Sequence, residues 1–222
     1  MKPETIMKTL DRIYGTVLDG IPHVAPPVTE WAERRLRRSE SADEAALHII
    51  NSQLGKCAAS GFVTGLGGIV TMPVALPLNL ATVLYFQLRM IAALAYLGGY
   101  DLQSPQVRSL SYVCLAGLTM EQVLKNTGIK IGTRLTKTIA AKLPARLTVT
   151  INQKVGYRLF TKFGGRSALS VGKAVPLVGG VISGTIDYVE SRAMAERAYR
   201  MFIEGTDDFA AGFAEYEILD ED

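Results

Sequence analysis

The longest uncharged stretch of this chain limits the folds that are open to it. From Cys57 to Leu88 there is no lysine, arginine, aspartate or glutamate over 32 consecutive positions. The stretch leads into residues 78–97, which have the composition of a helix and end at Gly98-Gly99, a pair typical of a helix C-cap. A segment this long and this apolar belongs in a protein core or in a bilayer.

Three placements are open for residues 57–97: a hairpin buried in the protein, a hairpin dipping part-way into a bilayer, and a transmembrane span. Two prolines and four glycines interrupt residues 60–77. Arg89 falls near the middle of the following helix, where a charge costs about 2.5–3.5 kcal/mol on insertion scales. These features favour a hairpin over a span. We expect the Gly/Pro-rich segments 60–97 and 169–190 to pack together as its core.

The rest of the sequence predicts an all-α fold, a single compact domain of about seven or eight helices. Apolar residues recur at helical spacing, for example in residues 4–19, and residues 105–127 read as one helix. Residues 146–152 alternate like a strand, but a strand without a partner is hard to accommodate, so we interpret them as helix. The expected regions are an N-terminal helical region (1–44), a main helical domain (45–204) and an acidic C-terminal tail (205–222).

Charged residues are strongly segregated along the chain. No acidic residue lies between Glu121 and Asp187, an interval that holds eleven lysines and arginines. Seven of them recur at helical spacing, with apolar residues on the opposite side. These candidate lipid-binding residues are Lys130, Arg134, Lys137, Lys154, Arg158, Lys162 and Arg166. Basic amphipathic helices suit the headgroup region of an anionic leaflet, where each basic side chain contributes about 1 kcal/mol.

Two other interpretations of the basic side are weighed against membrane docking. The first is a solvated surface, which helical proteins often have. The second is nucleic-acid binding, but the segment has no zinc, helix-turn-helix or ribonucleoprotein motif and no aromatic residues interleaved with its charges, so we expect no nucleic-acid partner. The acidic tail could shield the basic face within the same chain, which is a hypothesis that deleting residues 205–222 would test.

The sequence offers no recognisable catalytic machinery. The two histidines, His23 and His48, suggest no metal site, and no nucleophile elbow, phosphate-binding loop or metalloprotease helix is present. We therefore predict no catalytic residue, no metal and no cofactor, and favour a non-enzymatic role. The alternative is a lipid-directed hydrolase with a buried polar site near Arg89, Asp101 and Asp187.

Three motifs give the chain a resemblance to a known family. Pro77 is followed by Leu88-Arg89-Met90-Ile91-Ala92 and by the turn Gly98-Gly99-Tyr100-Asp101-Leu102; a glycine run, Thr64 to Gly68, precedes them; and Pro176-Leu177-Val178-Gly179-Gly180 with Gly184 and Asp187 follows. In order and spacing these resemble the EcsC family over residues 45–204. Asp187 departs from the pattern, since many members have asparagine there.

The resemblance implies a helical bacterial protein, cytoplasmic and membrane-associated, with a place beside an ABC transporter or in a lipid process. The partners we expect are therefore an anionic membrane surface and a membrane transporter. Within the chain, a buried Arg89 calls for a carboxylate from another element, and Asp187 is our candidate. Cys57 and Cys114 lie in apolar surroundings, and we expect buried reduced thiols.

Overall fold

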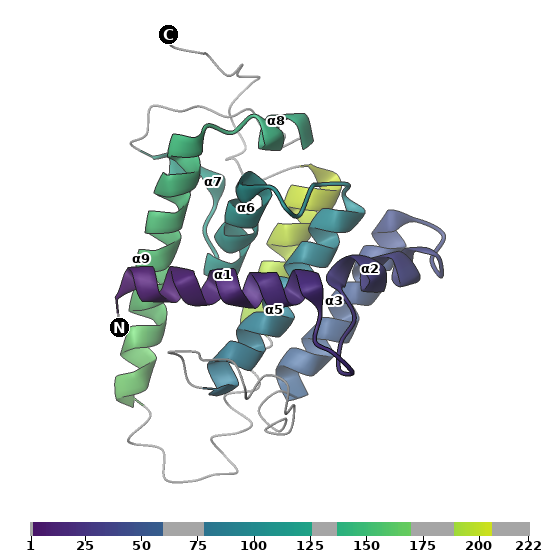
Figure 1. The fold of residues 1–222 in the computed structure, drawn as a ribbon, viewed down its shortest axis with the longest axis horizontal. Coiled ribbons are helices and arrows are strands. Elements are labelled where there is room, and N and C mark those ends of the chain that lie inside the picture. Colours follow the sequence, from purple (N-terminus) through teal and green to yellow (C-terminus); the bar gives the residue numbers. More distant parts are fainter. Residues whose placement is uncertain (1, 60–77, 126–136, 170–188, 206–222) are drawn as a thin grey trace.

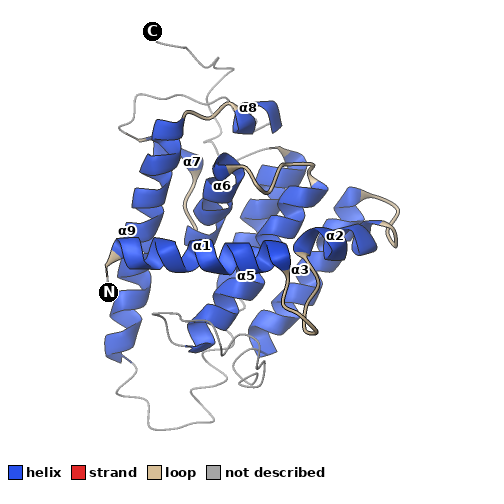
Figure 2. Ribbon diagram, in the orientation of Figure 1, coloured by secondary structure: helices blue, strands red, loops and turns tan. Residues whose placement is uncertain are grey.

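The computed structural model describes residues 2–59, 78–125, 137–169 and 189–205 (Figure 1). All regular elements among them are helical (Figure 2), which confirms the all-α prediction. The helices are α1 (Pro3–Asp19), α2 (Val28–Leu36), α3 (Ala42–Ala59), α5 (Leu78–Leu97), α6 (Pro105–Ala116), α7 (Met120–Leu124), α8 (Lys137–Ala141), α9 (Ala145–Leu169), a helix over 189–199 and its π-helical continuation η2 (Arg200–Glu204).

The central helix is α5. It packs against α1, α2, α3, α6 and η2, so other helices cover it on several sides. Leu88 and every residue of Met90–Ala95 are completely buried, which explains why this part of the sequence is apolar all round rather than amphipathic. The second half of the expected hairpin is therefore a core helix. Residues 60–77 and 170–188 lie outside the described residues.

None of the described helices combines the length and the apolar character needed to cross a membrane. Gln87 and Arg89 are both buried near the middle of α5.

The N-terminal helix α1 lies across α5 and α9 (Figure 1), and its apolar residues belong to the same core. Polar bonds also fix it there. Tyr112 of α6 donates to Asp11 Oδ1 at 2.8 Å, and Tyr14 of α1 donates to the carbonyl of Leu102 at 3.1 Å. The region 1–44 thus shares one hydrophobic core with the residues that follow it.

The C-terminal helix 189–199 is held beside α3 and α5 by two side-chain bonds. Buried Gln87 donates to Ser191 Oγ at 2.9 Å, and Tyr199 donates to Asp43 Oδ1 at 3.0 Å. The helix then widens into η2, whose Phe202 is buried against α5.

One expected helix is in fact two. The prediction of a single helix over 105–127 is wrong because Gly117 takes the left-handed conformation, φ 67°, and ends α6 as a C-cap. Helix α7 then begins with a capping box in which Thr119 and Gln122 exchange side-chain and backbone bonds. The expected helix over 146–152, by contrast, is confirmed as the start of α9.

Candidate functional site

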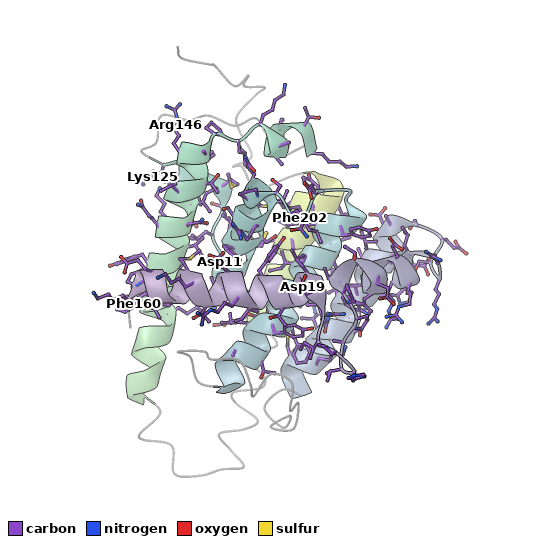
Figure 3. All side chains as sticks on the ribbon, in the orientation of Figure 1. Asp11, Asp19, Lys125, Arg146, Phe160 and Phe202 are labelled. Carbon is purple, nitrogen blue, oxygen red and sulfur yellow. The ribbon has the colours of Figure 1, made fainter. Side chains whose placement is uncertain are left out.

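The candidate site is the surface formed by α7, α8 and α9, which we term the basic face. Its sequence carries no acidic residue after Glu121 until Asp187. Five of its basic residues are exposed: Lys125, Lys137, Lys142, Arg146 and Arg158. Figure 3 labels Lys125 and Arg146 at the end of the molecule where α7 meets α9. An uncompensated set of cations on one side produces a positive potential that attracts polyanions.

Lys154 is at the centre of this face but serves the protein itself. Its ammonium group donates to the carbonyls of Gln122, Val123 and Lys125 at 3.2, 2.5 and 3.0 Å. These carbonyls end helix α7, where unpaired acceptors and the helix dipole favour a cation. Lys154 therefore joins α7 to α9, and its three donor positions are taken by these bonds.

Lys162 is also engaged within the chain. Its ammonium group lies 2.9 Å from Glu190 Oε2, and both side chains are largely covered. This ion pair connects α9 to the helix 189–199. Two of the four residues that recur every fourth position, Lys154 and Lys162, thus have intramolecular partners, whereas Arg158 makes no side-chain hydrogen bond or ion pair with the described part of the chain.

The outer side of α9 adds apolar side chains to the basic face. Val149 is 56 % exposed and Tyr157 is 65 % exposed. The opposite side of the helix, with Val155 and Leu159, is completely buried as the sequence predicts. Large apolar groups beside a basic side chain, here Arg146, on one exposed side are the composition expected of a surface that enters a headgroup layer.

Two open hollows of about 440 Å³ each indent this surface on either side of Arg158. The first lies between α7 and α9 and includes Leu118, Lys154 and Tyr157. The second lies between α9, the end of α6 and the helix 189–199. It is lined by Ala116, Gly117, Arg158, Thr161, Lys162, Glu190, Ala193, Met194 and Arg197.

The predicted buried polar site around Arg89 has a different character. The side chain is only 4 % exposed, and its guanidinium donates to the Tyr85 hydroxyl at 2.9 Å and to the Pro26 carbonyl at 2.7 Å. It also stacks on Trp31, with its central carbon 4.9 Å from the ring centroid. Burial, and next the charge of Arg89, lower the pKa of Lys56, which lies over the same ring at 5.9 Å. The hydrogen-bond partners of Arg89 in the described chain are thus neutral.

The other two residues of that predicted site are not brought to Arg89 by the described structure. Asp101 is exposed in the turn after α5, where its Oδ1 accepts a hydrogen bond from the backbone of Gln103 at 2.9 Å. Asp187 lies outside the described residues, so its pairing with Arg89 stays a prediction. Lys130 and Arg134 lie outside them as well, as does the side chain of Arg166.

Six residues described above were not singled out from the sequence as site residues: Lys125, Lys142, Arg146, Val149 and Tyr157 on the basic face, and Arg197 beside it. Val149 and Tyr157 follow Arg146 at helical spacing, and that pattern would have identified them had residues 146–152 been analysed as part of one long helix. Arg197 carries no such signal, because its proximity to Arg158 depends on how the helix 189–199 packs on α9.

Within the described ranges, no group of three histidine, cysteine or acidic side chains is arranged to hold a metal ion. Cys57 and Cys114 are both buried thiols that form no disulfide, as predicted.

In a comparison with protein families, the model described as the EcsC protein family matches residues 3–203. The match includes all the motifs that carry the resemblance and also α1 and α2. Comparisons with curated proteins and with solved structures give no match.

Proposed function

Because this chain belongs to the EcsC protein family, whose description names no reaction, we propose its function from its own surface: it docks peripherally on anionic membranes through the basic face. The observation that carries this proposal is the exposed side of α9. It combines Arg146 with the exposed Val149 and Tyr157, in a segment of sequence without acidic residues.

Two physical contributions act together in this docking. The exposed cations are attracted to the negative surface potential, each by about 1 kcal/mol, and this attraction weakens as salt screens it. Val149 and Tyr157 then enter the interfacial layer, with the phenol hydroxyl kept near the headgroups. A place beside a membrane transporter, implied by the family resemblance, would put the same face on the surrounding bilayer.

The test is co-sedimentation with vesicles that contain phosphatidylglycerol and with purely zwitterionic vesicles, at about 0.1 M and about 0.5 M salt. We expect binding to the anionic vesicles alone, reduced at the higher salt concentration. The variant Arg146→Glu should weaken this binding several-fold. Its matched control is Arg38→Glu, which changes an exposed arginine just after α2. Figure 1 shows α2 far from α9.

Equal losses in Arg146→Glu and Arg38→Glu would mean that net charge, and not the basic face, controls binding. An absence of binding to both kinds of vesicle would reject peripheral docking altogether. Salt-resistant binding to both kinds would replace it with insertion of an apolar segment.

A further inference from the structure

We propose that the hollow between α9, the end of α6 and the helix 189–199 binds the phosphate monoester headgroup of an anionic lipid. This inference rests on the proposed membrane docking and adds a specific ligand to it. Two arginines from different helices, Arg158 and Arg197, line this hollow. Neither makes a side-chain hydrogen bond or ion pair with the described residues, so no described residue takes up the donors of either guanidinium group.

Arg197 packs against the end of α6. Its Nη1 lies 3.1 Å from the point where a side chain on Gly117 would begin, so the guanidinium is in close contact with the C-cap of α6. The negative end of the α6 dipole favours a cation there. Arg197 is half-buried, whereas Arg158 is exposed at the rim.

The charge of the hollow matches a doubly charged anion. Among the described lining residues, Arg158, Lys162 and Arg197 bring three positive charges and Glu190 one negative charge, a net charge of +2. Lys162 neutralises Glu190 at 2.9 Å, which limits the repulsion between that carboxylate and an incoming anion. Phosphate monoesters carry a charge of about −1.5 to −2 at neutral pH, and arginine binds their oxygens in a bidentate manner.

The surroundings favour a lipid over a soluble phosphate. The hollow shares Arg158 and Thr161 with its neighbour, which is lined by Tyr157 and Leu118. A phosphate held by Arg158 would therefore lie next to an exposed aromatic ring that enters the membrane interface in the proposed docking. A soluble sugar phosphate has no apolar chain to pack against this apolar rim.

The experiment compares vesicles containing phosphatidic acid with vesicles containing phosphatidylglycerol at a mole fraction that gives the same surface charge. We expect binding to phosphatidic acid to be about tenfold tighter, the effect of one charge-assisted hydrogen bond or more. The double variant Arg158→Gln/Arg197→Gln should abolish this preference and also weaken binding to phosphatidylglycerol, because it removes a cation of the basic face. The double variant Arg158→Lys/Arg197→Lys keeps the charge, so it should also lose the preference but bind phosphatidylglycerol more tightly than the glutamine variant does.

The control is Lys142→Gln/Arg146→Gln, which should weaken binding to both lipids equally. Equal binding of the unchanged protein to both vesicles at matched charge would overturn the headgroup site while leaving peripheral docking in place. Binding to neither vesicle would reject the docking itself. If neither vesicle bound the protein but soluble glycerol 3-phosphate raised its melting temperature, the ligand of the hollow would be a soluble phosphate monoester and not a lipid.

Discussion

At the scale of single residues, the same kind of side chain plays two opposite roles on α9. Lys154 and Arg158 are one helical turn apart, and both belong to the sequence pattern that predicts lipid binding. The structure commits Lys154 to three carbonyls at the end of α7 but leaves Arg158 without a described partner. Periodicity alone could not separate them, because the end of α7 reaches Lys154 only through tertiary packing.

This difference predicts unequal stability effects. Lys154→Met keeps the length of the side chain but removes the charge-assisted bonds to α7, so the free energy of unfolding should fall by about 1–2 kcal/mol. Arg158→Met should change it by less than about 0.5 kcal/mol, as is usual for surface positions. Urea unfolding of both variants measures the two values. Equal losses would show that the α7 contacts add nothing to stability.

Buried tyrosines make stability depend on alkaline pH. Burial, as the largest cause, raises the pKa of Tyr14 from 10.0 to about 12, and burial with the adjacent Asp11 also raises that of Tyr112. The unfolded chain therefore loses the Tyr14 proton at lower pH than the folded chain does. The contribution of Tyr14, about 2–3 kcal/mol, is complete below about pH 10 and disappears as pH rises towards about 12.

Tyr14→Phe removes this titration, so its stability should fall less between about pH 9 and about pH 11 than that of the unchanged protein. Urea unfolding at the two pH values measures the difference. Tyr157→Phe is the matched control, because it removes a hydroxyl group from an exposed side chain. A Tyr14→Phe protein with unaltered pH dependence would contradict the assignment.

At the scale of elements, two glycines differ in the space available for a side chain. Gly15 lies inside α1 with no atom near the place of a side chain, whereas a methyl group on Gly98 would collide with the carbonyl oxygen of Phe202. Gly98 is thus the point where the end of α5 approaches η2. Gly15→Ala should raise the free energy of unfolding by about 0.5–1 kcal/mol through helix propensity.

Gly98→Ala should lower the free energy of unfolding by about 2 kcal/mol or more, because the backbone of η2 must move away. Thermal and urea unfolding of the two variants provide the comparison. A neutral Gly98→Ala variant would mean that α5 and η2 separate at little cost, and the packing of the C-terminal helix on the core would have to be weaker than the structure indicates.

Element positions were the part of the fold most open to prediction. Helical periodicity placed α1, and the Gly98-Gly99 pair placed the end of α5, because both signals are local. The break at Gly117 was missed, since a glycine inside a helical pattern is compatible with continuation. In the structure Gly117 ends α6 in the left-handed conformation, and a capping box starts α7 two residues later. How α1 crosses α5 and α9 depends on contacts far apart in sequence, such as Asp11 with Tyr112.

At the scale of the whole molecule, the segregation of charge was visible from the sequence, but the site within it was not. The interval without acidic residues predicts a basic side of the protein. Which cations are available depends on Glu190 and on the end of α7, which take up Lys162 and Lys154. The second arginine of the phosphate hollow, Arg197, belongs to a helix that begins more than thirty residues after Arg158 in the sequence.

The same segregation leads to a prediction for the C-terminal tail. Residues 205–222 contain seven aspartates and glutamates and no basic residue, so their removal raises the net charge from +3 to +10. If the tail shields the basic face, the truncated protein should bind anionic vesicles more tightly than the full chain, most clearly at low salt where charges are least screened. A second variant, with these seven residues changed to asparagine and glutamine, keeps the length of the tail and should bind as tightly as the truncated protein. Tighter binding by truncation alone would point to steric obstruction, and unchanged binding in both variants would show that the tail leaves the basic face open.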